Sequence, residues 1–171
     1  MMNRRKIAFG KEYENLIIAG INGGRWIDAG AGRGAYTLPL AQLVDEVLAI
    51  DINKGNTNRL KEMIKQLELS NIFVREGDLT DIENYKEKIQ GVLFAFSLHY
   101  QTDITFLKEL LKEKKSKESF KVVIIEYIRI KPVSWVPHPY PPKKLLIELS
   151  SMQQKAEIKF RNDRYYILVL E

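Results

Sequence analysis

The chain has 171 residues, 45% of them hydrophobic, which is enough for one domain with a sizeable core. It has no cysteine, so disulfide bonds, thiolate metal sites and cysteine nucleophiles are excluded, and no apolar run reaches the roughly 20 residues of a membrane helix. The net charge of +5 permits an acidic partner, but lysines and glutamates alternate over 112–121, which is typical of a solvated helix end.

The first half of the chain is predicted to alternate strands with helices. The expected strands cover 25–30, 46–51 and 71–78. The expected helices cover 34–44, 53–69 and a short stretch near 81–88. The second of these helices is indicated by apolar residues at helical spacing from Leu60 to Leu67 and by Asn53, whose side chain can cap the first turn.

The second half continues this alternation and then departs from it. Near-continuous apolar runs predict strands over 91–100 and 120–130, each buried on both faces. Helices are expected over 104–115 and near 143–151. The last two strands, 154–160 and 164–170, are separated only by Arg161 to Asp163, so they are expected to form an antiparallel hairpin.

Strands joined by helices indicate βαβ units and a parallel, doubly wound sheet. The hairpin adds an antiparallel strand, so the expected fold class is α/β, with a sheet of about seven mostly parallel strands. The chain shows no internal repeat and no low-complexity linker, and residues 1–171 are therefore interpreted as a single domain.

A glycine-rich turn, WIDAGAGRGAY at 26–36, joins the first strand to the first helix. Its glycines permit positive φ and close approach of a ligand to the backbone, and the helix N-terminus offers unpaired N–H groups. Two ligand classes use such a turn: a dinucleotide, or a nucleoside cofactor without phosphate. The loose dinucleotide pattern G-x-G-x-x-[GA] is satisfied by 30–35, and Asp51, about 20 residues further on, satisfies its ribose-binding acid.

Three features argue against the dinucleotide. Asp28 lies two residues before the first glycine, where a dinucleotide turn has an apolar residue, and burial of an unpaired carboxylate there is costly. A carboxylate fits if it meets a cationic part of the ligand, directly or through water. No length is left for a separate substrate domain, and the terminal hairpin is foreign to ordinary dinucleotide folds. The nucleoside cofactor is therefore favoured.

These motifs resemble those of the class I S-adenosylmethionine (SAM)-dependent methyltransferases. The first motif of that family, (D/E)-x-G-x-G-x-G, is present as DAGAGRG at 28–34. Its acid at the end of the second strand corresponds to Asp51 in LAID, and its acid after the third strand corresponds to Asp78 in REGDL. The resemblance covers essentially the whole chain and implies a Rossmann-like fold with SAM as cofactor.

The resemblance also implies a place for each part of SAM. Asp51 would accept hydrogen bonds from the ribose hydroxyls, Asp78 would face the adenine amino group, and the methionine end would lie near Asp28. The cofactor-binding residues that it implies are Asp28, Gly30, Gly32, Asp51, Ile52, Asp78, Leu79 and Phe96. Other roles stay open for two of them, because Asp51 also suits a solvated strand end or helix cap and Asp78 suits the N-cap of the next helical stretch.

The methyl acceptor is harder to predict, because SAM is already activated and needs a general base only when the acceptor loses a proton. Amino-methyltransferases of nucleic acids carry (D/N/S)-P-P-(Y/F) after the fourth strand, whereas this chain has FSLHY at 96–100. FSLHY resembles instead the S-L-H segment of the small-molecule branch, typified by quinone-biosynthesis methyltransferases. By that resemblance His99 lines the acceptor pocket; the alternative is a hydrogen-bonded core histidine.

No catalytic residue is assigned, but candidates stand near the expected ligand edge. They are His99, Glu126, His138 and Tyr140. Glu126 lies near the carboxyl end of the fifth strand, where it either orients an acceptor or pairs with a lysine. The proline-rich segment 129–142 is expected to be a pocket wall or lid, or else a rigid connector. A substrate-covering insert is therefore predicted over 131–151, and 1–24 is predicted to form a cap over the cofactor.

The expected function is transfer of a methyl group from SAM to an O, N or C nucleophile of a small molecule. The alternatives are RNA or protein methylation, a non-catalytic SAM-binding module that regulates a partner and, less favoured, a nicotinamide oxidoreductase. No clear carboxylate cluster indicates a metal site, and no membrane partner is expected. The N-terminal stretch lacks the apolar core of a signal peptide, so a cytoplasmic protein is expected. The oligomeric state is not indicated.

Overall fold

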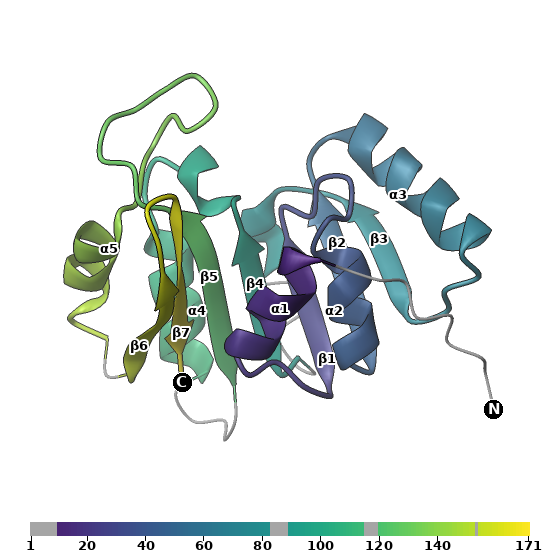
Figure 1. The fold of residues 1–171 in the computed structure, drawn as a ribbon, viewed down its shortest axis with the longest axis horizontal. Helices are drawn as coiled ribbons and strands as arrows, with labels where there is room; N and C mark the ends of the chain where they lie inside the picture. Colours follow the sequence, from purple (N-terminus) through teal and green to yellow (C-terminus); the bar gives the residue numbers. More distant parts are fainter. Residues whose placement is uncertain (1–9, 83–88, 115–119, 153) are drawn as a thin grey trace.

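The computed structural model describes residues 10–82, 89–114, 120–152 and 154–171. Within these ranges, a single seven-stranded sheet has helices packed on both of its faces (Figure 1). The strands are β1 (Arg25–Ala29), β2 (Glu46–Asp51), β3 (Ile72–Glu76), β4 (Gly91–Ala95), β5 (Lys121–Tyr127), β6 (Ala156–Arg161) and β7 (Tyr165–Leu170). The helices are α1 (Lys11–Ile18), α2 (Thr37–Leu43), α3 (Lys54–Gln66), α4 (Thr105–Lys114) and α5 (Pro142–Leu149), together with the 3₁₀ turn η2 (Leu98–Tyr100).

The strand order of the sheet is β3-β2-β1-β4-β5-β7-β6. The neighbours from β3 to β5 are parallel, whereas β7 runs antiparallel to both β5 and β6. The α/β prediction is therefore confirmed, including the C-terminal hairpin. The hairpin turn is fixed by Asn162, whose Oδ1 accepts the backbone N–H groups of Arg164 at 2.8 Å and Tyr165 at 2.9 Å.

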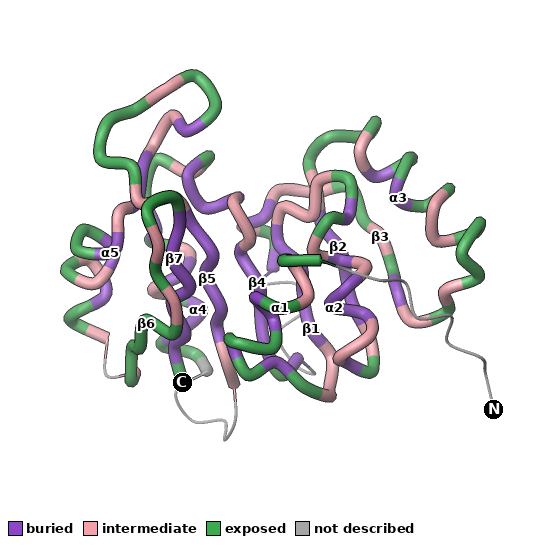
Figure 2. Tube along the Cα trace, viewed as in Figure 1, coloured by how far each residue is buried: buried purple, intermediate pink, exposed green. Residues whose placement is uncertain are grey.

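The apolar core lies on both faces of the inner strands, and Figure 2 shows that β1, β4, β5 and β7 consist mostly of buried residues. Successive side chains of a strand point to opposite faces, so each strand serves two layers. In β5, Val122 and Ile124 pack with α4 and α5, while Val123 and Ile125 pack on the side of α1 and α2. This double burial explains why the inner strands are continuously apolar in sequence.

Two predicted strands end earlier than expected. The strand predicted over 91–100 stops at Ala95, because Phe96 takes a positive φ of 52° and η2 then begins. The buried hydroxyl of Ser97 donates to the Ala29 carbonyl oxygen at 2.6 Å, which fixes this turn against the end of β1. The strand predicted over 120–130 stops at Tyr127. Both ends lie at the same edge of the sheet, where a ligand site was expected.

The predicted helices are present, with one stretch untested. Asn53 caps α3 as expected, because its side chain accepts the N–H of Asn56 at 3.1 Å. Most of the helical stretch expected near 81–88 lies outside the described residues. Of the cap predicted over 1–24, residues 1–9 lie outside the described residues; the remainder contains α1, which packs on the sheet through the fully buried Leu16.

The carboxyl ends of β1 and β4 meet where the strand order changes direction. Ligands of open α/β sheets bind outside the carboxyl ends of the strands at such a point. A long loop over 128–141 rises above the same edge (Figure 1). Among the helices of the described ranges, none combines the length and apolar character needed to cross a bilayer.

Candidate functional site

The turn between β1 and α2 is held close to the end of β2. The backbone N–H groups of Gly30 and Ala31 both donate to the Ile50 carbonyl oxygen, at 2.8 and 2.9 Å. Gly30, Gly32 and Gly34 have φ values of 81°, 57° and 90°, in the left-handed region that side chains disfavour. The turn therefore needs glycine at each of these positions.

The space around the three glycines differs. A Cβ atom on Gly30 would lie 2.5 Å from the Cβ of Ser97, and one on Gly34 would lie 2.5 Å from Cδ1 of Leu60. These two glycines let the turn pack against the protein itself. A Cβ on Gly32 would have no atom within 4 Å. Gly32 is thus the point of the turn where the backbone faces open space that a ligand can enter.

This difference predicts unequal costs for two matched substitutions. Gly30→Ala should lower the free energy of unfolding by about 3 kcal/mol, because left-handed strain adds to a clash with Ser97. Gly32→Ala should cost about 1 kcal/mol, which is the strain alone. Urea unfolding followed by circular dichroism measures both values. Equal costs would show that Ser97 yields to the added methyl group.

Asp28, at the end of β1, is buried beneath this turn with 1% of its surface exposed. Its Oδ2 accepts the hydroxyl of Thr37, the first residue of α2, at 2.6 Å. Burial raises the pKa of the Asp28 carboxyl to about 7, and the negative charge of Asp51 acts in the same direction, while the Thr37 hydrogen bond opposes them. The carboxyl group is therefore held in a dry site in which a cationic neighbour would stabilise its charged form.

Asp51 ends β2 with its carboxylate held by the backbone. Its Oδ2 accepts the N–H of Gly32 at 2.7 Å, and its Oδ1 accepts the N–H of Asn53 at 2.8 Å. Ile52 follows with 70% of its surface exposed, an unusual place for a large apolar side chain. The edge of β2 thus offers a fixed hydrogen-bond acceptor next to an uncovered apolar surface.

Asp78 forms the cap-like turn that was one of its two predicted roles. Its Oδ1 accepts both the N–H and the hydroxyl of Thr80, at 2.9 and 2.8 Å. Its own N–H donates to Oδ2 of Asp81 at 2.9 Å. The Leu79 side chain is buried in the core. The backbone of Leu79 is the part of the residue that can make a polar contact with a ligand.

Phe96 occupies the end of β4 in a strained conformation. A positive φ is uncommon for a residue of this size, and such strain clusters at functional sites. The Phe96 ring is half-buried, with its centroid 4.6 Å from that of Tyr127 and 6.2 Å from that of Tyr36. Tyr36 belongs to the glycine turn, so the aromatic contacts connect that turn to the ends of β4 and β5.

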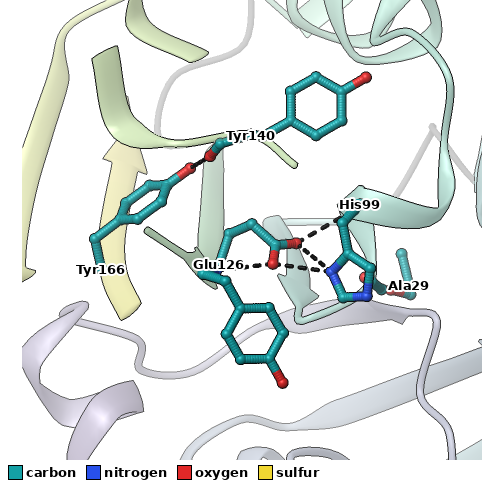
Figure 3. A network of polar contacts seen from close by, with 7 residues as sticks. Ala29, His99, Glu126, Tyr140 and Tyr166 are labelled. Atoms are coloured by element: carbon teal, nitrogen blue, oxygen red, sulfur yellow. Dashed lines mark hydrogen bonds and ion pairs between the residues drawn. The ribbon is translucent and has the colours of Figure 1, made fainter. Parts of the chain in front are cut away.

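His99 and Glu126 form a buried pair at the same edge (Figure 3). Nδ1 of His99 lies 2.9 Å from Oε1 and 3.0 Å from Oε2 of Glu126. The carboxylate also accepts the N–H of His99 at 3.3 Å and the N–H of Tyr127 at 2.8 Å. The Glu126 carboxylate thus orients the imidazole and connects η2 to the end of β5.

The side chains of the other two catalytic candidates, Tyr140 and His138, form no hydrogen bond with this pair in the described structure. Tyr140 is buried, its hydroxyl donates to the Gln101 carbonyl oxygen at 3.1 Å, and its ring points away from the pair in Figure 3. Burial raises the pKa of the Tyr140 hydroxyl to about 12, and the Tyr140 carbonyl oxygen accepts the Tyr166 hydroxyl at 2.6 Å. The structure thus gives Tyr140 a packing role. His138 contacts the pair through its backbone N–H, which donates to the His99 carbonyl oxygen at 3.1 Å.

The predicted insert 131–151 consists of two parts. Its second part, α5, packs into the core through Leu145 and Leu149, so it belongs to the helix layer. The first part is in the loop that rises above the sheet edge. There Trp135 stands edge-on to the Tyr127 ring with centroids 5.2 Å apart, and the Arg129 guanidinium lies 5.3 Å from the Trp135 ring. Of the two parts of the predicted insert, this loop is the one whose position allows it to form a wall of an acceptor site.

The pairing of His99 with Glu126 was missed from the sequence, although a signal for it was present. A carboxylate inside the apolar run VVIIEYI must be paired if the strand is buried. The chain has only two histidines, and one of them follows the neighbouring strand. In the part of the chain that the structure describes, no three His, Asp or Glu side chains are grouped to hold a metal ion.

Comparisons with known proteins indicate the family of the chain. A family model described as a methyltransferase domain matches residues 27–127, from β1 to the end of β5. The protein-L-isoaspartate O-methyltransferase of Yersinia pestis is 41% identical over 54 residues, which is 32% of this chain and 26% of that protein. The chain therefore spans about a quarter of the length of the curated relatives it matches.

Solved structures share the fold over most of the chain. A SAM-dependent methyltransferase from Aquifex aeolicus has a TM-score of 0.71 and 17% identity, covering 95% of this chain and 89% of its own. Magnesium protoporphyrin IX methyltransferase from Synechocystis PCC 6803, solved with bound SAM, has a TM-score of 0.65 and 16% identity, covering 93% and 74%. At these identities the likeness concerns the fold alone.

Proposed function

The chain belongs to the methyltransferase-domain family, and from this membership we propose that it transfers the methyl group of SAM to a small-molecule acceptor. The observation that carries the proposal is the edge of β2, where the Asp51 carboxylate is fixed by the Gly32 N–H beside the exposed Ile52. A carboxylate of this kind suits a pair of ribose hydroxyls, and an exposed apolar side chain suits the flat face of adenine. No phosphate is needed at either place.

The methionine end of SAM falls, in this proposal, at the glycine turn. Its ammonium group is the cation that the buried Asp28 carboxyl lacks in the described structure, either in direct contact or through water. Gly32 gives the cofactor room beside the backbone. The methyl group then points toward the ends of β4 and β5, where Phe96 and His99 lie.

A small molecule is favoured as acceptor because the loop over 128–141 is anchored above the strand ends. Its backbone is tied to η2 through His138 and His99, and its Trp135 packs on Tyr127. The second candidate is an RNA acceptor, which is favoured by the exposed basic side chains of Arg129 and Lys131 on the same loop. The two acceptors differ in that only RNA binding should weaken steeply with added salt.

Calorimetric titration with SAM, and separately with NADH, tests the cofactor. The wild-type protein should bind SAM with micromolar affinity and should not bind NADH. Asp51→Ala should weaken SAM binding about 100-fold, because two hydrogen bonds to a charged acceptor are lost. Glu62→Ala, on the exposed side of α3, is the matched control and should leave binding unchanged. Absence of SAM binding by folded wild-type protein would refute the proposed function.

A further inference from the structure

One nitrogen of the buried His99 ring is left without a role in the fold. Nδ1 is held by Glu126, but Nε2 is buried and has no hydrogen-bond partner among the described residues. Leaving a buried polar atom unpartnered costs free energy, and native structures rarely do so without reason. A ring nitrogen that the fold itself leaves unsatisfied is a place where a bound molecule supplies the partner.

The environment of Glu126 decides which ring nitrogen carries the proton. A carboxylate only accepts hydrogen bonds, so Nδ1 must be the protonated nitrogen when it donates to Glu126. The backbone N–H groups of His99 and Tyr127 hold that carboxylate in place. In the neutral imidazole, Nε2 therefore presents a lone pair and is an acceptor for a proton.

The location of the ring places this lone pair at the ligand edge of the sheet. Two residues before His99, the Ser97 hydroxyl donates a hydrogen bond to the carbonyl oxygen of Ala29, the last residue of β1. The imidazole therefore lies near the carboxyl end of β1 (Figure 3). Tyr100 packs on the imidazole with ring centroids 4.3 Å apart and is itself 59% exposed. Tyr127 lies on the ring as well, with centroids 5.6 Å apart.

We propose that Nε2 of His99 is the general base for an acceptor hydroxyl group, with Glu126 as its positioning residue; this rests on the proposed function. The hydroxyl oxygen attacks the methyl carbon of SAM, and the carbon–sulfur bond breaks with its electron pair remaining on sulfur. The hydroxyl proton passes to Nε2, and Glu126 stabilises the imidazolium that forms. The products are the methyl ether and S-adenosylhomocysteine, and the imidazolium then loses its proton to water.

The residues around His99 also indicate the chemical class of the acceptor. A carboxylate has no proton to lose at neutral pH, so this base would have no task with a carboxylate acceptor. Two exposed aromatic rings lie near the imidazole: Tyr100, 59% exposed, packs directly on it, and Trp135, 51% exposed, packs on Tyr127, which contacts the imidazole in turn. A flat aromatic ring that carries the hydroxyl group stacks on such faces. The proposed acceptor is therefore a phenol, and because Nε2 is buried in the described structure, a neighbouring side chain must move aside when the phenol binds.

The first test reads the protonation of His99 without any acceptor. Long-range proton–nitrogen NMR of the whole, untagged chain with SAM bound should show Nδ1 protonated and Nε2 unprotonated at mildly alkaline pH. The chain has only two histidines, so His138→Asn assigns the signals and serves as the control. Glu126→Gln should remove the tautomer preference of His99. An Nε2–H tautomer in the wild-type protein would overturn the proposal.

The second test uses 4-methylphenol and 4-nitrophenol as acceptors, with release of S-adenosylhomocysteine as the readout. At pH about 8.5 the first is largely un-ionised and the second is largely ionised. His99→Asn should lower kcat/KM for 4-methylphenol by about 10²–10⁴-fold, and for 4-nitrophenol by less than about tenfold, because the latter has already lost its proton. Glu62→Ala, on the exposed side of α3, should affect neither acceptor in this way.

The outcomes separate this inference from the proposed function. Equal losses for both phenols would assign His99 a structural role and overturn the base assignment. Failure of the wild-type protein to methylate either phenol while it binds SAM would overturn the acceptor class. Failure to bind SAM would refute the proposed function itself. If His99→Asn does not fold, His99→Gln takes its place, and the NMR result on the wild-type protein still decides the tautomer.

Discussion

Asp28→Asn is expected to make the protein more stable at pH 8 and unable to bind SAM tightly. The Asp28 carboxyl has a pKa of about 7 in the folded chain, against an ordinary value of 3.8, mainly because it is buried. Between these two values the folded state binds more protons than the unfolded state. Stability therefore falls as the pH rises from about 4 to about 7, and by pH 8 the full penalty is present.

The size of the effect follows from the two pKa values. Their difference corresponds to about 4 kcal/mol at most, and an asparagine removes this penalty while still accepting the Thr37 hydroxyl. Its amide N–H₂ needs a partner of its own, so we expect a net gain of about 1–3 kcal/mol at pH 8. Urea unfolding at pH 5 and pH 8 measures it, and the stability of the variant relative to the wild-type protein should be about 2–3 kcal/mol lower at pH 5 than at pH 8.

Binding should change in the opposite direction. The SAM ammonium group loses its negative partner in Asp28→Asn, so affinity at pH 8 should fall about 100-fold. In the wild-type protein, affinity should rise between pH 6 and pH 8 as Asp28 ionises, and this rise should be absent in the variant. Thr37→Val keeps the carboxyl but removes the hydrogen bond that lowers its pKa, so in this variant the rise in affinity should persist and move to higher pH. A variant that is less stable at pH 8 would show that Asp28 is not destabilising when charged.

The fold was predictable because its signals are local or periodic. The continuous apolar character of β5 requires burial on both faces, and the few residues between β6 and β7 allow only a hairpin. The end of β4 was not predictable in this way. Phe96 prefers to continue the strand, and only the tertiary contact of Ser97 with Ala29 turns the chain there.

The candidate site was predictable to the extent that motif residues stand at strand ends. The sequence placed Asp28, Asp51 and Gly32 at one edge, and the structure brings Asp51 and Gly32 into direct contact. The sequence did not separate the roles of Gly30 and Gly32, because Ser97, which crowds Gly30 and not Gly32, comes from a distant part of the chain. The sequence indicated His99 and Glu126 as separate candidates but not as a pair. They are 27 residues apart, and only the pairing of β4 with β5 brings them together.

Glu126→Ala is expected to lower the free energy of unfolding by about 3–5 kcal/mol, which is a large part of the stability of a small domain. The reason is the number of buried donors that lose their acceptor. These are Nδ1 of His99 and the backbone N–H groups of His99 and Tyr127. Glu126→Gln keeps one acceptor oxygen in the same place and should cost about 1–2 kcal/mol.

A double variant distinguishes the backbone contribution from that of the imidazole. In a pair of side chains alone, replacing both partners by apolar groups restores much of the stability lost on removing one. Here His99→Leu with Glu126→Ala removes Nδ1 but leaves the two backbone N–H groups unpartnered. We therefore expect it to remain at least about 2 kcal/mol less stable than the wild-type protein. Full recovery in urea unfolding would mean that water satisfies those two groups, and that Glu126 serves the imidazole alone.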